Sequence, residues 1–458
     1  MNILIFGTGD CYSKYKKWFE KFHIVALLDN DRSKQGTEID GHKVLAPIEG
    51  VRENYDYIFI LSVHEAEIRK ELQVLGVEDS KILHYFGLHN FLKKEADIPR
   101  LPVHFYPYAE GKRTVLMLSY DLNPSGAFQA FFEAAVILQK NGYCVVVASM
   151  DDGPMKKMFL NSQIPVIVDP NMQINTCSDI EWIQEYDVVF CNTLNFYYML
   201  SKREDFQQYI WWLHEPEIFY EGIDAEELRK ISNENLHIYA AGEAAVAAFK
   251  KFQPESKVSL LRYGIPDVYL SARKKACGDK HKKKFALVGN VQKYKGQDLL
   301  IDAIKSLDEE TRRRSEFFIY GNKASKYAED LILAAENLSN VHFEGAITRK
   351  ELLEKLYDID ILVCPSRADT MPVAVTEAMM MHIPCIVSDA VGTAKYITDG
   401  GDGIVFKSGD KHALARVIYR CAFDEIDLQA MGNAGRNLYD SYFSMEVFEK
   451  TLLDIFAK

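Results

Sequence analysis

Short apolar runs alternate with amphipathic helical patterns along the whole chain, and this alternation constrains the fold more than any other feature. Such runs are typical of strands buried on both faces, as in parallel sheets covered by helices. Two segments interrupt the rhythm: DIPRLPVHFYPYAEGKR (97–113), rich in proline and aromatic residues, and RKKACGDKHKKK (273–284), rich in lysine. Both are typical of linkers. The sequence therefore predicts an α/β protein with three doubly wound units.

The predicted strands fall into three groups. They are 2–7, 23–29 and 57–62 in the first group; 114–119, 143–149, 187–191, 210–214 and 237–241 in the second; and 285–290, 317–321, 341–345, 360–366, 384–389 and 403–406 in the third. Helices are expected between them, the clearest from Gly126 to Lys140, and two more near 410–422 and 445–457. We predict a small domain over 1–96, a second over 113–272 and a third over 284–458. The last helix is free to pack back on the second domain.

Composition narrows the range of partners. The 458 residues carry a net charge of −12, which argues against nucleic acid or an anionic membrane as the main partner. The basic run at 273–284 suits a solvated linker better than a docking patch for anionic lipid or phosphate. The eight cysteines are scattered without a Cys-x-x-Cys pair, which is typical of reduced thiols rather than disulfides or zinc ligands. Since neither a signal peptide nor a transmembrane segment is evident, we expect a cytoplasmic protein.

PSRADTMPVAVTEAMMMHIPCIVSD (365–389) is the most informative segment. A buried strand is followed by a polar loop, and a helix is expected to begin near Thr370, with Pro372 in its first turn. The free N–H groups of Met371, Val373 and Ala374 would then form an anion-binding helix N-terminus.

Two carboxylates flank this helix start. Glu377 lies further along the helix and can accept two hydrogen bonds from a vicinal diol such as that of ribose. Asp369, in the loop, is placed to meet a sugar hydroxyl. The plainer alternative is that Asp369 caps the helix and Glu377 is a surface residue.

The spacing Asp369-x7-Glu377 followed by HIPCIVSD resembles the hallmark of the family 4 retaining glycosyltransferases, which have the GT-B fold. GNVQKYKGQDLLIDAI (289–304) is similar to the family's glycine-rich turn, and SDAVGTAKYITDGGDGIVF (388–406) to its later glycine-rich loop. The resemblance covers roughly residues 113–458. It departs from the family in Asp at position 369 and in Asn290, where arginine is common.

The resemblance implies roles for single residues. Lys295 corresponds to the lysine that meets the donor diphosphate, and the helix start at Met371, Pro372 and Val373 to the turn that binds it. Asn290 belongs to the same donor site. A second phosphate-binding cation would be Lys293, Arg262 or Arg367.

The second unit offers two loops at the expected carboxyl ends of its strands. SYDLNPSGAF (119–128) contains Gly126, which permits close approach of backbone to a sugar or phosphate and resembles the family's first glycine-bearing loop. In IWWLHEPE (210–217), His214 resembles the residue that touches the transferred sugar; a core histidine is an equal alternative.

The front unit carries GTGDCY (7–12) after its first strand and Asp29 at the end of the second. Gly7, Gly9 and Asp29 form only part of a dinucleotide fingerprint. Residues 1–90 are more similar to the small Rossmann-like domain found in some sugar acyltransferases, where it can bind a nucleotide-sugar. A fold without a ligand is an equal alternative.

The predicted function is transfer of a sugar, with retention, from a nucleotide-diphosphate sugar, most simply a UDP-sugar, to a glycan, lipid-linked or protein acceptor. His214, Asp369 and Lys295 are the expected catalytic residues. No cofactor and no metal are expected, because the Asp-x-Asp strings at 29–31 and 358–360 lie away from the proposed donor site. A non-catalytic nucleotide-sugar-binding subunit and an NAD-dependent oxidoreductase stay open as alternatives, as do peripheral membrane association and homo-oligomers.

Overall fold

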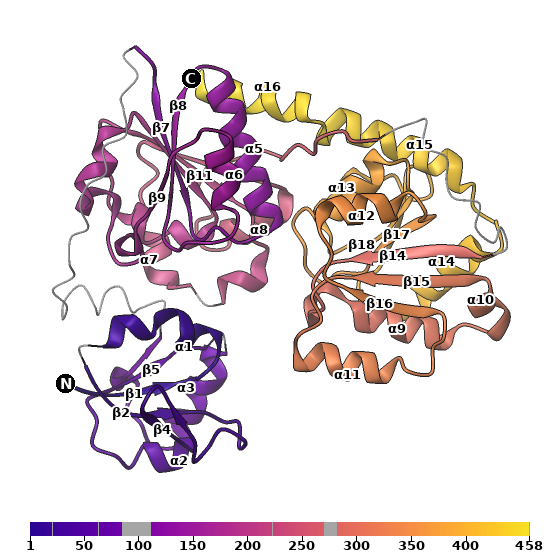
Figure 1. Ribbon diagram of the computed structural model, residues 1–458. Helices are drawn as coiled ribbons and strands as arrows, with labels where there is room; N and C mark the ends of the chain where they lie inside the picture. The colour runs from indigo at the N-terminus through magenta and orange to yellow at the C-terminus, as the bar shows by residue number, and fades with distance from the viewer. Residues whose placement is uncertain (21, 63, 85–110, 222, 270–281, 458) are drawn as a thin grey trace.

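The computed structural model describes residues 1–20, 22–62, 64–84, 111–221, 223–269 and 282–457 (Figure 1). Three sheets, each covered by helices, confirm the predicted α/β architecture with a small domain in front. Among the described strands every pairing is parallel except β3 with β4. Most of the two predicted linkers, 97–110 and 273–281, lies outside the described residues.

The front sheet has the order β3-β4-β2-β1-β5-β6. Its elements are β1 (Asn2–Phe6), α1 (Asp10–Tyr15), β2 (His23–Leu28), β3 (Glu38–Ile39), β4 (His42–Leu45), α2 (Pro47–Gly50), β5 (Tyr57–Ile60), α3 (Glu65–Val74) and β6 (Ile82–His84). The central strands β1 and β5 are almost completely buried, as expected for strands with helices on both faces. The hydroxyl of Tyr15, at the end of α1, forms a hydrogen bond with that of Tyr120 in the second unit.

The second sheet has the order β13-β12-β11-β10-β7-β8-β9. Its strands are β7 (Thr114–Ser119), β8 (Cys144–Ser149), β9 (Val166–Val168), β10 (Val188–Asn192), β11 (Gln208–Leu213), β12 (Leu236–Ala240) and β13 (Val258–Leu260). Its helices are α5 (Gly126–Lys140), α6 (Lys156–Asn161), α7 (Ala225–Lys230) and α8 (Glu243–Lys250). Ser125 caps α5 by accepting a hydrogen bond of 3.0 Å from the N–H of Phe128, which fixes where this helix begins.

The third sheet has the order β16-β15-β14-β17-β18-β19. Its strands are β14 (Lys283–Val288), β15 (Ser315–Tyr320), β16 (Val341–Gly345), β17 (Ile361–Cys364), β18 (Cys385–Ser388) and β19 (Ile404–Phe406). Its helices are α9 (Gln297–Ser306), α10 (Glu309–Arg313), α11 (Lys326–Ala334), α12 (Arg349–Leu356), α13 (Val373–Met380), α14 (Lys411–Ala422) and α15 (Leu428–Leu438). Strand β14 begins inside the predicted basic linker, so Lys283 and Lys284 belong to the sheet.

Several elements were not predicted. The short strands β3, β4, β6, β9 and β13 lie at or next to the sheet edges, where few residues pair and the apolar signal is brief. Helix α15 was also missed, because it contains Gly432 and Gly435, which have low helix propensity. A Cβ at Gly432 would lie 2.1 Å from the carbonyl oxygen of His382, so only glycine permits this packing.

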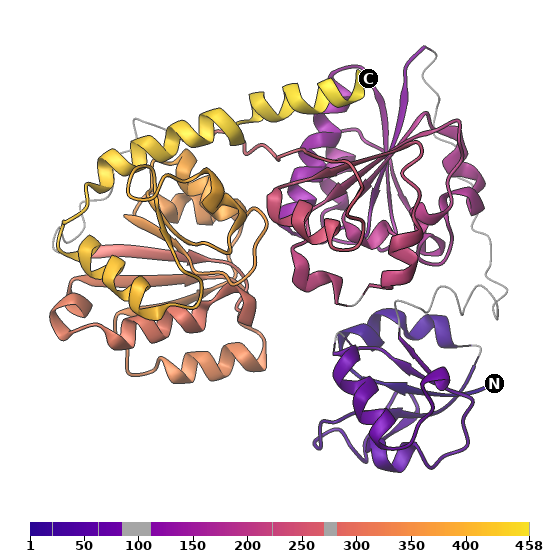
Figure 2. The same ribbon diagram turned by 180° about the vertical axis from the view of Figure 1, so that it is seen from behind.

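The last helix, α16 (Met445–Phe456), leaves the third unit and packs against α5 of the second, as both views show (Figures 1 and 2). The ring of Phe448 stacks on Trp212, with centroids 5.8 Å apart, and Phe456 stacks on Phe190 at 6.2 Å. Arg113 donates a hydrogen bond of 2.8 Å to the carbonyl of Phe456. The C-terminal end of the chain thus completes the core of the second unit.

We predict that Phe448→Ala lowers the free energy of unfolding by about 3–5 kcal/mol, because a fully buried aromatic ring is lost and a cavity is left. Urea unfolding followed by tryptophan fluorescence reports on the adjacent Trp212. Phe206→Ala, at a side chain that is 70% exposed, is the matched control and should cost less than about 0.5 kcal/mol. Equal effects of the two substitutions would show that α16 does not stabilise the second unit.

Candidate functional site

The N-terminal ends of α5 and α13 meet between the second and third units. A Cβ placed on Gly126, the first residue of α5, would lie 3.0 Å from Cγ2 of Val373, the first residue of α13. Each helix begins after a strand at the carboxyl end of its sheet, where ligands of open α/β sheets bind. The structure therefore brings together Gly126 and the 371–373 turn, two elements that the sequence predicted for one site.

Glycines also line the turn before α13. A Cβ at Gly242 would lie 2.9 Å from Cγ of Met371, and one at Gly392 would lie 1.7 Å from the carbonyl oxygen of Thr370. The hydroxyl of Tyr263 donates a hydrogen bond to the carbonyl of Met371. These contacts come from both large units, so the turn is held by both.

Helix α13 begins three residues later than predicted. Its first residue is Val373, and Pro372 is the N-cap rather than a residue of the first turn. The reason is that Pro372 has an extended conformation, with ψ 118°, so the helix cannot include it. The N–H groups of Val373 and Ala374 lack acceptors within the helix, as at any helix start, whereas Met371 lies outside the helix. Binding of an anion at this turn stays a prediction.

Lys295 and Asp369 form an ion pair beside this helix start. Lys295 lies at the end of the short helix η9 (Lys293–Lys295), and its Nζ is 2.6 Å from Oδ2 of Asp369. Burial disfavours the ammonium charge, but the neighbouring Asp369 outweighs this and raises the pKa of Lys295. The lysine is therefore a permanent cation next to the α13 N-terminus.

Glu377 is buried in α13, with its side chain only 3% exposed, and pairs with Arg349 of α12. The distance from Nε of Arg349 to Oε1 of Glu377 is 2.8 Å. Burial raises the pKa of Glu377, and the arginine partly opposes this. The interpretation of Glu377 as a surface residue was therefore wrong. A ribose diol that binds Glu377 must displace or share the Arg349 guanidinium.

Three residues were suggested as the second phosphate-binding cation. Arg367 forms two hydrogen bonds with Asp298, of 2.8 and 2.7 Å, and Arg262 donates one of 2.5 Å to the hydroxyl of Tyr396. Lys293 is exposed and has no ion pair within the described parts of the chain. Lys293 is consequently the cation of the three that is available to a ligand.

Asn290 joins two loops of the third sheet. Its Oδ1 accepts a hydrogen bond of 3.2 Å from the N–H of Asn322, and its carbonyl accepts one of 3.0 Å from Gln297. These contacts give Asn290 a structural role; its contact with a donor stays a prediction.

His214 directly follows β11. The carbonyl of Leu213, the last residue of this strand, accepts a hydrogen bond from the N–H of Ala241, which directly follows β12. Its ring lies 4.5 Å from that of Trp212, and its Nε2 is buried and has no partner among the described residues. Burial lowers the pKa of His214 to about 3, so the imidazole is neutral. A neutral ring with an unused nitrogen can exchange one hydrogen bond with a ligand.

Glu215 was not predicted as a site residue. Its Oε2 accepts hydrogen bonds from the N–H of His214, at 2.9 Å, and of Leu194, at 3.0 Å. Burial raises the pKa of Glu215 to about 7, although these backbone donors oppose the shift. The carboxyl group fixes the backbone of His214 to the segment after β10.

Other polar groups at these strand ends also escaped prediction. Thr193 has φ 83°, an uncommon conformation for a β-branched residue, and its hydroxyl is buried without a partner in the described chain. The hydroxyls of Thr370 and Thr393 and Oδ1 of Asn192 are likewise buried without a hydrogen-bond partner in the described chain. A buried polar group without a protein partner can form a hydrogen bond with a ligand or with an ordered water. Thr370 and Thr393 lie within the segments that resemble the family, whereas no motif in the sequence marks Asn192 and Thr193.

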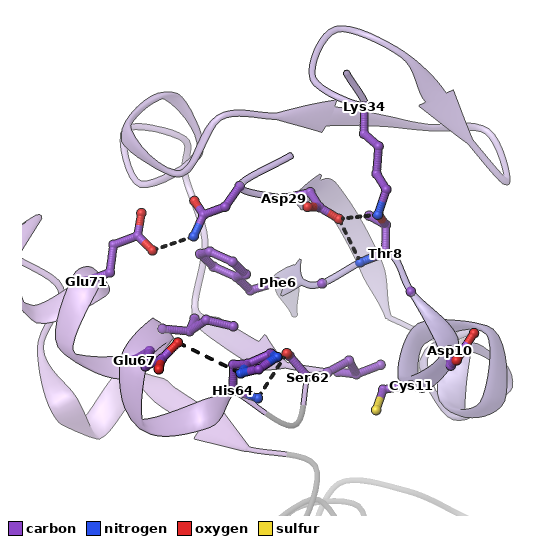
Figure 3. Close-up of a pocket in the computed structure, with 15 residues that line it drawn as sticks. Phe6, Thr8, Asp10, Cys11, Asp29, Lys34, Ser62, His64, Glu67 and Glu71 are labelled. Atoms are coloured by element: carbon purple, nitrogen blue, oxygen red, sulfur yellow. Dashed lines mark hydrogen bonds and ion pairs between the residues drawn. The ribbon is translucent and has the colours of Figure 1, made fainter. Parts of the chain in front are cut away.

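Gly7, Gly9 and Asp29 lie together at a separate cavity in the front domain (Figure 3). The N–H of Thr8 donates a hydrogen bond of 3.2 Å to Oδ2 of Asp29, and the Thr8 hydroxyl donates another. Asp29 thus holds the glycine turn that follows β1. These residues do not contribute to the site between the two large units.

Among the described residues, no group of three or more His, Cys, Asp or Glu residues could hold a metal ion. No helix in this part of the chain has the length and apolarity needed to cross a bilayer.

Comparison with family models identifies two segments. Residues 271–438 match the model "Glycosyl transferases group 1", and residues 1–83 match "C2185-like, N-terminal". A lipopolysaccharide glucosyltransferase, WaaG of Escherichia coli, is 30% identical over 118 residues, covering 26% of this chain and 31% of WaaG. A second relative is 24% identical over 242 residues, which cover 51% of this chain and 62% of the relative. It is a GDP-mannose-dependent monoacylated alpha-(1-6)-phosphatidylinositol monomannoside mannosyltransferase of Corynebacterium glutamicum. The chain thus spans less than two thirds of the length of these curated relatives.

Solved structures resemble the two large units. Anabaena Alr3699/HepE in complex with UDP and glucose has a TM-score of 0.64 at 17% identity, covering 75% of this chain and 99% of that protein. The WaaG structure has a TM-score of 0.56 at 19% identity, and the match covers 74% of this chain and 98% of WaaG. These likenesses confirm the predicted GT-B fold. Residues 271–438 are thus similar to the glycosyltransferase group 1 domain, and the chain has a GT-B fold preceded by a small domain.

Proposed function

We propose that the protein is a retaining glycosyltransferase of the family 4 type, which moves a sugar from a nucleotide-diphosphate sugar to a glycan, lipid-linked or protein acceptor. The observation that carries the proposal is the meeting of the α5 and α13 N-terminal ends at Gly126 and Val373, beside the Lys295–Asp369 pair. Two helix N-termini and the half-buried ammonium group of Lys295 would create positive potential where the diphosphate leaving group develops charge.

A UDP-sugar is the proposed donor. HepE binds UDP and UDP-glucose, and its fold aligns with 75% of this chain. Relatives named for lipopolysaccharide and amylovoran synthesis support a role in surface polysaccharide or glycoconjugate synthesis. In this arrangement Glu377 would bind the ribose, and Lys295 with the N–H groups of Val373 and Ala374 would bind the diphosphate.

The transferred sugar would contact His214 and Asp369. A neutral His214 can hydrogen-bond a sugar hydroxyl without opposing the positive charge that develops on the sugar ring. Asp369 supplies a negative charge near that ring. As the bond to the diphosphate breaks, a phosphate oxygen can accept the proton of the acceptor hydroxyl on the same face, which gives retention without a separate base.

We expect Lys295→Ala to lower kcat for hydrolysis of UDP-glucose by about 100-fold, because the cation acts on charge that grows in the transition state. Release of UDP measures the rate. Lys305→Ala, at an exposed lysine of α9, is the control and should change kcat less than about twofold.

An unchanged kcat in Lys295→Ala would contradict this role and leave Lys293 as the phosphate cation. Tight UDP binding by the wild-type protein without any hydrolysis or transfer would favour the non-catalytic binding subunit instead.

Glu215 is proposed as a positioning residue, because it bonds to the backbone of His214 and Leu194 but has no place among the reacting groups. Its raised pKa has a testable consequence. Between about pH 5 and 7 the unfolded state has lost the Glu215 proton while the folded state keeps it, so this group makes stability fall as pH rises.

The free energy of unfolding of the wild type minus that of Glu215→Gln should therefore decrease between about pH 5 and 7, by up to about 3 kcal/mol. Urea unfolding of both proteins across this range gives the difference, and Glu234→Gln, at an exposed residue, is the control substitution. A difference that is constant or rises with pH would contradict a protonated, buried Glu215.

A further inference from the structure

The front domain contains a cavity of about 650 Å³ at the carboxyl ends of β1, β2 and β5 (Figure 3). This is the edge at which open α/β sheets bind ligands. Gly9 opens directly onto empty space, since a Cβ at that position would have no atom within 4 Å. The volume is in the range of small-molecule sites.

The side chains around the cavity do not suit a nucleotide. Asp29, the residue that would hold a ribose diol, already accepts hydrogen bonds on both oxygens: from Asp31 on Oδ1, and from Thr8 and Lys34 on Oδ2. Lys34, paired with Asp29 at 3.1 Å, is the one lysine among the lining residues, which include four carboxylates. A diphosphate would therefore meet an occupied ribose clamp and an excess of negative charge.

Carboxylates dominate the lining. Asp10, Glu67 and Glu71 join Asp29 there, against Lys34 and the imidazole of His64. Oε2 of Glu71 accepts a hydrogen bond of 2.7 Å from Asn30, and the side chain of Glu67 is 85% exposed. Ionised carboxylates only accept hydrogen bonds, so they repel anions and attract ligands rich in hydroxyl donors.

We propose that this cavity binds an uncharged, hydroxyl-rich saccharide, and that the saccharide is the outer part of the glycan acceptor. Its hydroxyl groups would donate to Asp10, Glu67 and Glu71. The assignment to the acceptor rests on the proposed transferase function; the binding of a saccharide rests on the cavity alone.

Helix α1 connects the cavity to the acceptor unit. Asp10 and Cys11 at its start line the cavity, and Tyr15 at its end bonds to the hydroxyl of Tyr120. Six helical residues span only about 9 Å. Tyr120 follows β7, in the same loop as the start of α5, so one short helix separates the cavity from the loop that reaches the proposed donor site.

The test uses the full-length protein and saturation-transfer NMR with lactose, maltose, mannobiose and chitobiose, and with UDP as the contrasting ligand. Gly9→Phe adds a ring at the glycine turn that lines the cavity. A Cβ at this position has no atom within 4 Å. Val74→Phe adds the same ring at a position of the same domain that is 80% exposed.

We expect at least one disaccharide to bind the wild type and Val74→Phe equally, and Gly9→Phe to raise its Kd by at least about tenfold. UDP should bind all three proteins alike. Loss of UDP binding in Gly9→Phe would overturn the proposal in favour of a nucleotide, and so would the absence of any disaccharide sensitive to Gly9→Phe.

Binding of the constituent monosaccharides, measured in the same way, distinguishes a glycan chain from a free monosaccharide as the ligand. Weaker binding of the units than of the disaccharide supports a glycan chain, whereas equal binding would overturn the assignment to the acceptor. Failure of the wild type to hydrolyse any nucleotide-sugar would contradict the proposed function but not saccharide binding, so the two failures are distinguishable.

Discussion

The close packing of the turn before α13 is the constraint on which the proposed site depends. Residues 370–373 lie against glycines from three other segments, at Gly126, Gly242 and Gly392, and any Cβ at these positions would crowd the turn or the first residue of α13. Because two of these glycines belong to the second unit, the first N–H groups of α13 are fixed relative to α5. Preorganised donors of this kind need no rearrangement when charge develops on a leaving group.

Burial and ion pairing together determine which side chains around this turn are charged. Lys295 keeps its proton because Asp369 lies 2.6 Å away, and Glu377 is held by Arg349. His214 has no such partner, so burial lowers its pKa to about 3 and leaves it neutral. The result is a permanent cation beside the helix N-terminus and an uncharged ring on the opposite unit, which suits a negatively charged diphosphate and a sugar that develops positive charge.

Much of this could be predicted from the sequence, for identifiable reasons. Long buried strands such as 114–119 and the spacing from Asp369 to Glu377 are local signals, and the fold and the pairing of Gly126 with the 371–373 turn follow from where parallel strands end. The Arg349–Glu377 pair, the buried Glu215 and the saturated Asp29 could not be predicted, because each depends on contacts between residues far apart in the chain. Helix α15 was missed since its glycines serve packing rather than helix propensity.

The most direct test of the account is proton NMR of the reaction with UDP-glucose in the presence of excess EDTA. The account predicts release of UDP and a first-formed product with the α-anomeric configuration of the donor, because Lys295 and the α13 N-terminus neutralise the diphosphate without a metal. A β-configured first product would contradict retention. Complete loss of activity in EDTA, restored by Mn²⁺, would contradict the metal-free site.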